Sequence, residues 1–305
     1  MIEKKVRKIR NYINIPQKQF ALLKDRAKWN QLCASMDVIE DTQMAINSYF
    51  ALDDFGAFSG GYLYLYGLLQ AFYLQQDAIS DLHVSLLGGK SGDFKKLFPP
   101  ELALVRELRN AAVGHPTNTG KSFHFISRPT IRKDHFQLIS SFKDGSPVTF
   151  QEVNVLALRE QQEKSTGKIL DKVIRELEKE MGAQKKKFKG KKLADLIPPQ
   201  WDYAKGKVFE GIWSNYPLAR PHFEELCEVL EKIKTALNER YNSYEALQGI
   251  KEHFVKIDHC QERMSQWFKE NKIHGNKDAE IFMDAFGHYA DELFERLKEL
   301  DEDWK

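Results

Sequence analysis

The sequence Arg109-Asn110-Ala111-Ala112-Val113-Gly114-His115-Pro116 closes a predicted helix and sets the arrangement of its most reactive side chains. The pair Pro99-Pro100 is well suited to the first turn of that helix. Gly114 is typical of a helix C-cap, and Pro116 disfavours the α conformation at the residue before it. We therefore predict a helix that begins near Pro99 and finishes near His115, with the histidine on a bend.

The side chains of this motif, residues 109–115, suit the cleavage of a phosphodiester. Arg109 can hold a phosphate through two parallel donors, Asn110 can orient it, and His115 can move a proton near neutral pH. In an ideal helix Arg109 and His115 would point about 240° apart. Either the last turn unwinds, or two chains present their motifs to one cleft. In the alternative, purely structural interpretation, Arg109 pairs with Glu101 or Asp77, and His115 bonds terminal carbonyls.

Residues 62–87 predict a long helix that faces the motif. Polar and aromatic side chains recur along it every three or four residues, so they share one face. Three of them are candidates for orienting the histidine, namely Tyr66, Gln70 and Asp77. A buried polar network that sets the helix register is the alternative.

The rest of the chain also indicates a mostly helical protein. Residues 1–56 and 151–181 have helical periodicity, and a small β-hairpin is expected near residues 122–150, with a turn at Lys143-Asp144-Gly145-Ser146. The fold class is therefore all-α, with a helical bundle, a small hairpin insertion and a helical C-terminal region. The expected domains are 1–184 and 193–305, joined by a mobile basic linker at 185–192.

Two basic segments are candidates for contact with RNA phosphates. Residues 1–30 carry nine Lys or Arg against two Asp or Glu. In the linker, lysines flank a phenylalanine that could stack on a base; the residues are Lys185, Lys186, Lys187, Phe188 and Lys189. Solvated, amphipathic surfaces are the alternative interpretation for both segments.

The 109–115 motif resembles the Arg-polar-x4-His signature of the HEPN superfamily (higher eukaryotes and prokaryotes nucleotide-binding), and the helical context of the first half of the chain is similar. The resemblance implies a metal-independent endoribonuclease and a homodimer. The expected products are a 2′,3′-cyclic phosphate and a 5′-hydroxyl. It also implies a toxin, antiphage or RNA-processing setting, with a neutralising partner protein in the toxin case. The alternative is a catalytically silent HEPN-like module that binds RNA, a nucleotide or a partner protein, and a helical adaptor is a third possibility.

Cysteine spacing and hydropathy bear on metal binding, on the cellular compartment and on membrane association. Cys33, Cys227 and Cys260 are far apart and show no metal-ligand spacing, which favours a reducing compartment. No apolar run is long enough to span a bilayer, and no secretory signal follows the basic N-terminus. We therefore expect a cytoplasmic protein without a metal, a cofactor or a membrane partner.

Overall fold

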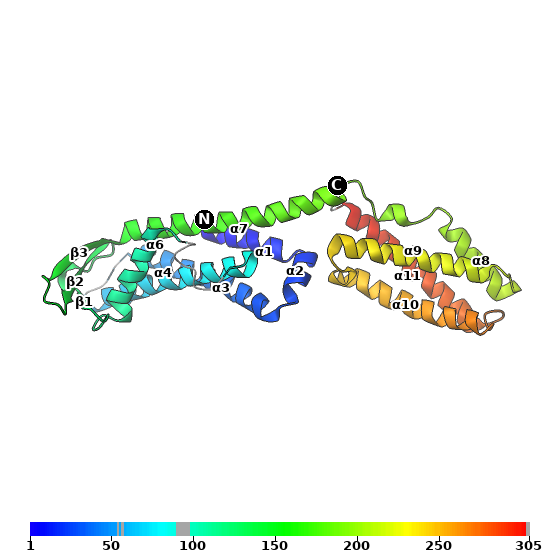
Figure 1. The fold of residues 1–305 in the computed structure, drawn as a ribbon, viewed down its shortest axis with the longest axis horizontal. Coiled ribbons are helices and arrows are strands. Elements are labelled where there is room, and N and C mark those ends of the chain that lie inside the picture. The colour runs from blue at the N-terminus through cyan, green and yellow to red at the C-terminus, as the bar shows by residue number, and fades with distance from the viewer. Residues whose placement is uncertain (54, 56–57, 90–97, 303–305) are drawn as a thin grey trace. The chain divides into compact units, whose positions relative to one another are not determined.

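The computed structural model describes residues 1–53, 55, 58–89 and 98–302. The chain forms two compact units, shown in Figure 1. The first comprises Met1–Ile13 and Leu22–Lys179, and the second comprises Asn14–Ala21 and Glu180–Lys305. None of the described helices is long and apolar enough to cross a membrane.

The first unit is built around two long helices that pack side by side, α3 (Arg26–Ala51) and α4 (Phe58–Leu87). The predicted apolar side of α4 is buried, including Leu65, Leu69 and Phe72. Its other described helices are α1 (Ile2–Ile13), most of α7 (Val155–Phe188), and α6 (Pro100–Arg109), which continues as a π-helical turn, Asn110–Gly114. Helix α2 (Pro16–Leu23) belongs mainly to the second unit.

A network of hydrogen-bonded, buried glutamines crosses the first unit and fixes the rotation of α4 about its axis. Gln75 donates to Gln43 of α3 (3.1 Å), and Gln162 of α7 donates to Gln75 (2.9 Å). Gln76 in turn donates to Gln162 (2.9 Å) and to the carbonyl of Leu102 in α6. Buried amides are costly without partners, so this network favours one register of four helices.

A three-stranded antiparallel sheet stands where a two-stranded hairpin was expected. Its order is β1 (Ser122–Ile126), β2 (His135–Phe142) and β3 (Thr149–Asn154). The predicted turn after β2 is confirmed, with Gly145 at a positive φ of 79° and the carboxylate of Asp144 accepting from the amide of Ser146. The interpretation of residues 151–154 as helix is wrong, because β2 supplies backbone partners for these residues and Val155 begins α7 only afterwards. The fold is therefore mostly α with a small sheet.

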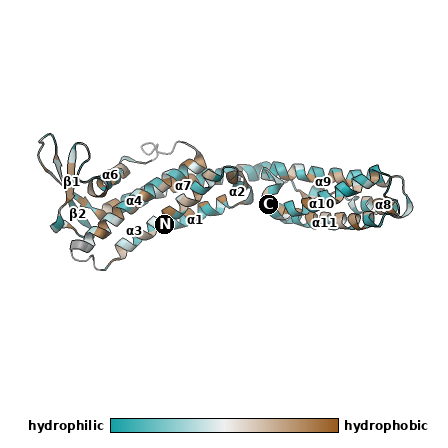
Figure 2. Ribbon diagram, turned by 90° about the horizontal axis from the view of Figure 1, so that it is seen from below, coloured by the Kyte–Doolittle hydropathy of each residue, from teal (hydrophilic) through white to brown (hydrophobic). Residues whose placement is uncertain are grey.

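The second unit packs α8 (Trp201–Ser214), α9 (Ala219–Tyr241), α10 (Gln248–Lys269) and α11 (Lys277–Glu302) around its own apolar core. In Figure 2 hydrophobic and hydrophilic stretches alternate along these helices, as amphipathic packing requires. Arg240 is almost fully buried and pairs with Asp301 at 2.7 Å.

The basic run is not a mobile linker in its first half, because α7 continues through Phe188. Phe188 is only 5% exposed, and the guanidinium carbon of Arg240 lies 5.8 Å from its ring centroid. Burial of this aromatic side chain in the second unit stabilises the helical conformation of residues 185–188. The proposed stacking of Phe188 on a base is therefore wrong, whereas Lys185, Lys186, Lys187 and Lys189 remain exposed.

Candidate functional site

The helical stretch that carries the motif ends at His115, as the sequence predicts, but its last turn is not α-helical. Helix α6 stops at Arg109, and the next five residues widen into a π-helical turn closed by the amide of His115, which donates to the carbonyl of Asn110 at 2.8 Å. His115 then has φ −139° and ψ 51°, outside the α region, as expected before Pro116. This turn contacts α4 and β1, so the motif lies where these two elements approach one another.

Arg109 is held by neutral groups on three sides. Its Nε donates to Oε1 of Gln70 at 2.9 Å, and its Nη1 donates to Oδ1 of Asn110 at 3.0 Å. The guanidinium carbon lies 4.3 Å from the ring centroid of Tyr73. No carboxylate in the described part of the chain pairs with it. Arg109 is therefore an oriented cation whose charge no carboxylate among the described residues compensates.

Gly114 has a different role from the expected one. It is not among the glycines with positive φ, so its conformation does not require glycine. A Cβ built at this position would lie 2.8 Å from Nη1 of Arg109 and 3.5 Å from Oδ1 of Asn110. Gly114 thus makes room for the Arg109 guanidinium on the turn.

Asp77 does not contact the histidine or Arg109, which corrects both interpretations offered for it. Its carboxylate accepts from Nη1 of Arg106 at 2.6 Å. The Arg106 guanidinium carbon also lies 4.0 Å from the Tyr73 ring centroid. Of the two arginines that meet this ring, Arg106 is neutralised by an acid and Arg109 is not.

His115 is the motif residue that the fold does not bring to Arg109. Its side chain is exposed, and it makes no hydrogen bond or ion pair with the residues that the structure describes. The predicted unwinding occurs as the π-helical turn, yet it does not join the imidazole to the guanidinium. Of the site residues predicted from the sequence, the structure brings Asn110 and Gln70 to Arg109.

Tyr66 lies beside the bend rather than on Arg109. Its ring packs edge-to-face on Tyr62 at 5.6 Å, and it lines a pocket of about 700 Å³ together with Pro116 and Thr117. Burial raises the pKa of Tyr66, so its hydroxyl stays protonated and can donate a hydrogen bond at neutral pH.

A second histidine, which the sequence interpretation missed, lies next to the motif. His124 on β1 donates its backbone amide to the carbonyl of Pro116 at 2.6 Å. Its ring nitrogens lie 2.9 Å from Oγ of Ser122 and 2.7 Å from Oγ of Ser140. Burial lowers the pKa of His124. The alternation Ser122-Phe123-His124 was the available signal, since it places the serine and the histidine on one strand face.

A basic groove on α7 was also missed. It has a volume of about 530 Å³, and its cations recur at spacings of four, four and three residues, so they lie on one helix face; they are Lys164, Lys168, Lys172 and Arg175. All four are exposed and form no ion pair within the described ranges. Glu101 is the one acid among the residues that line this groove.

The N-terminal basic segment is neutralised in part, in contrast to the α7 groove. Lys5 pairs with Asp171, Lys8 pairs with Glu178 at 2.6 Å, and Arg10 reaches both Asp37 and Glu40. These three cations of residues 1–30 are therefore already neutralised by acids.

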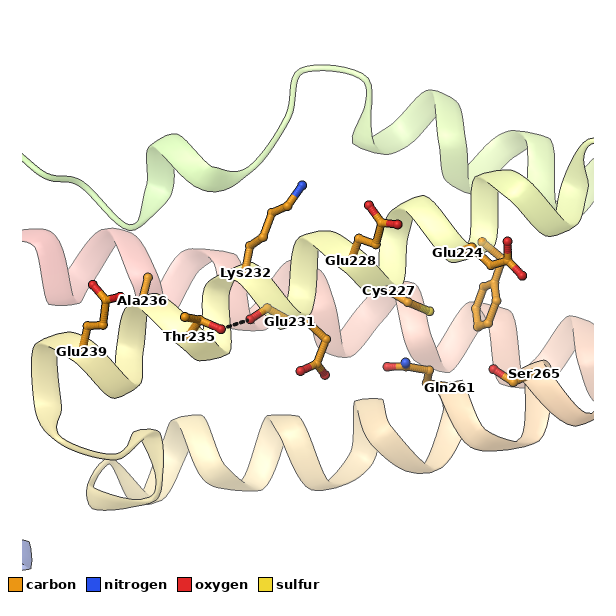
Figure 3. Close-up of a pocket in the computed structure, with 11 residues that line it drawn as sticks. Glu224, Cys227, Glu228, Glu231, Lys232, Thr235, Ala236, Glu239, Gln261 and Ser265 are labelled. Atoms are coloured by element: carbon orange, nitrogen blue, oxygen red, sulfur yellow. Dashed lines mark hydrogen bonds between the residues drawn. The ribbon is translucent and has the colours of Figure 1, made fainter.

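A groove of about 860 Å³ lies in the second unit, between α9 and α10 (Figure 3). Its rim carries glutamates and one lysine, the glutamates being Glu224, Glu228, Glu231 and Glu239. Burial, with further contributions from Glu231 and Glu224, raises the pKa of Cys227 to about 12, so this cysteine remains a thiol. A groove with this charge repels a polyanion.

Among the described residues, no group of three or more His, Cys, Asp or Glu side chains is placed to hold a metal ion. Comparisons with family models, with curated proteins and with solved structures find no match to this chain.

Proposed function

We propose that the protein is a HEPN-type endoribonuclease that cleaves RNA without a metal ion. In the reaction the ribose 2′-oxygen attacks the adjacent phosphorus and the bond to the 5′-oxygen breaks. The 2′-hydroxyl loses a proton and the departing 5′-oxygen gains one. The products are a 2′,3′-cyclic phosphate and a 5′-hydroxyl, and no water is consumed.

One observation carries the proposal: Arg109 is oriented by neutral partners, and none of the carboxylates that the structure describes pairs with it. Its Nε and Nη1 are engaged by Gln70 and Asn110. Its Nη2 makes no hydrogen bond with the described residues. A guanidinium fixed in this way can bind a phosphate and neutralise the charge that develops on its oxygens. On the same helix, by contrast, Arg106 is paired with Asp77.

His115 is the proposed group that moves the proton. It is exposed at the end of the π-helical turn, and an imidazole can both accept and donate a proton. Because it does not reach Arg109 of its own chain, we propose that two chains form the site as a homodimer. Each phosphate would then meet Arg109 of one chain and His115 of the other.

The α7 groove supplies the proposed path for the RNA backbone. Helix α6 begins at this groove, which includes Pro99, and ends at Arg109, so the two sites are separated by about 15 Å along the helix. Successive cations on α7 are about 6 Å apart, which suits consecutive phosphates of an extended strand.

The test is cleavage of a mixed-sequence RNA in excess EDTA by matched variants. Arg109→Lys keeps the charge but loses the planar fork, so we expect a loss on the order of 10²-fold. Arg106→Lys on the same helix should stay near wild type, because a lysine can still pair with Asp77. His115→Ala should lower the rate about 10²- to 10⁴-fold. Equal activity of the two lysine variants, or cleavage that requires a divalent ion, would contradict the proposal.

A catalytically silent RNA-binding module is the second candidate, and the isolated position of His115 favours it. In that case no cyclic phosphate forms, yet Arg109→Lys still weakens RNA binding. Binding and cleavage measured on the same variants therefore separate the two functions.

A further inference from the structure

A pocket of about 340 Å³ lies between α6 and the inner face of the sheet. Its apolar walls are Leu104 and Leu108 of α6, Ala111 of the π-helical turn, and Leu138 of β2. The volume is near the lower end of the range for small-molecule sites. Apolar walls on facing elements suit a flat ring that is buried on both sides.

The polar groups of the pocket are almost all uncharged. They include the carboxamides of Asn110 and Gln151, the hydroxyls of Thr119 and Ser140, and the imidazole of His124. No lysine or arginine is among the lining residues, and Glu107 is their one charged group. A phosphate therefore finds no counterion here, whereas a neutral ring with hydrogen-bonding edges finds both donors and acceptors.

The hydroxyl and imidazole groups form one continuous chain. Thr119 Oγ1 lies 2.6 Å from Ser122 Oγ, which is followed by both nitrogens of His124 and by Ser140 Oγ. Each hydroxyl can rotate, so this hydrogen-bonded series of side chains can present either a proton or a lone pair to the pocket. Because burial lowers the pKa of His124, the imidazole is uncharged at physiological pH, and so is the series of side chains that it joins.

Asn110 joins the pocket to the phosphate-binding arginine. Its Oδ1 accepts from Nη1 of Arg109, which leaves its amino group free to donate into the pocket that it lines. Carboxamides are suited to paired hydrogen bonds with the edge of a nucleobase. A phosphate on Arg109 would thus lie next to a pocket that suits the base of the same strand.

From this arrangement we propose that the α6–sheet pocket binds one nucleobase of the RNA strand and selects where the strand is cut. The inference rests on the proposed function, because it takes the ligand of Arg109 to be an RNA phosphate. What it adds to the proposed function is that a neutral nucleobase is held between α6 and the sheet, while the phosphate stays outside the pocket.

Binding of free nucleosides tests the pocket without any cleavage. Adenosine, guanosine, cytidine and uridine are titrated into the full-length protein by ligand-detected NMR, with ribose 5-phosphate as the probe that lacks a base. Leu104→Trp and Gln151→Trp fill the pocket from α6 and from β3, at positions that are exposed and outside the core. Leu156→Trp on α7 is the control, since Leu156 is exposed to a similar extent (48% against 40% for Leu104) and lines no described pocket.

We expect at least one nucleoside to bind wild type, Arg109→Ala and Leu156→Trp alike, and both pocket-filling variants to bind it at least tenfold more weakly. Ribose 5-phosphate should respond to Arg109→Ala and not to Leu104→Trp. Nucleoside binding that both pocket-filling variants retain, or the lack of any nucleoside binding to the wild type, would overturn the inference. If nucleosides bind as expected but RNA is not cleaved in EDTA, the proposed function fails and the pocket stands.

Discussion

At the scale of single residues, the surroundings of two arginines on one helix distinguish a structural role from a binding role. Arg106 and Arg109 lie three residues apart on α6 and both contact the ring of Tyr73. Asp77 neutralises the first, whereas Gln70 and Asn110 only orient the second. A phosphate that binds Arg109 therefore meets a cation whose position is already set, which reduces the entropy lost on binding.

Gly114→Ala tests whether that position matters. A methyl group at residue 114 would lie 2.8 Å from Nη1 of Arg109, so the guanidinium has to move. We expect RNA cleavage to fall on the order of 10²-fold, as displacements of about 1 Å can cause, while the melting temperature changes little. The control is Gly206→Ala in α8, where an added Cβ meets no atom within 4 Å; there we expect full activity and about 0.4–1 kcal/mol of added stability. Unchanged cleavage by Gly114→Ala would argue against a fixed Arg109.

At the scale of secondary-structure elements, the glutamine network places the face of α4 that meets Arg109. Gln162 is its central member and contacts Gln75, Gln76 and the carbonyl of Phe72. The sequence interpretation assigned a register-setting network to Tyr66, Gln70 and Asp77 as its alternative. The buried network is instead formed by their neighbours on the inner side of α4.

Gln162→Leu should destabilise the protein although leucine is more apolar. It removes the donor to the buried oxygen of Gln75 and one of the two acceptors of the Gln76 amide, at a cost of about 1–3 kcal/mol. Urea unfolding measures the change. Gln161→Leu, one residue earlier and only half-buried, should stay within about 0.5 kcal/mol of wild type. Similar effects of the two substitutions would contradict a special role for the buried network.

The lysines of α7 give the second prediction at this scale. Replacing Lys164, Lys168 and Lys172 by glutamine removes three phosphate contacts if the groove carries the RNA strand. The slope of log affinity against log salt concentration should fall by about 0.7 for each lysine, or about two in total. Replacing Lys185, Lys186 and Lys187 is the matched control and should leave the slope nearly unchanged. If the slope falls only when Lys185, Lys186 and Lys187 are replaced, the RNA strand binds the basic run at the end of α7 and not the groove.

At the scale of the whole molecule, Arg109 and His115 do not meet within one chain, so the proposed site requires a second copy of the chain. Near the motif, α4 exposes Leu63 and Leu74 beside Tyr66 and Gln70, on the face that a second chain would cover. A two-fold axis through this face would bring both copies of the motif together.

Mixing two inactive variants tests a composite site. Arg109→Ala and His115→Ala chains are each expected to lack activity, but their heterodimer retains one intact pair of Arg109 and His115 contributed by different chains. Co-expression should therefore restore part of the wild-type rate, and sedimentation should report a dimer. An active monomer, or mixed dimers without activity, would rule the composite site out.

The amino-acid sequence by itself determined the features that depend on neighbouring residues. The end of the π-helical turn after α6 follows from the preference of the residue before Pro116. The turn after β2 follows from Asp144 and Gly145, and the buried side of α4 follows from its helical periodicity. Each of these preferences acts over a few residues, so a linear pattern contains it.

Only the tertiary structure decided which side chains meet across the chain. It paired Asp77 with Arg106 rather than with Arg109, gave residues 149–154 a strand partner, buried Phe188, and joined His124 to Ser140 beside the motif. Several similar residues could have made each of these contacts, and their sequence spacing does not rank them. The choice depends on burial and on the positions of distant elements, which become defined only when the whole core is packed.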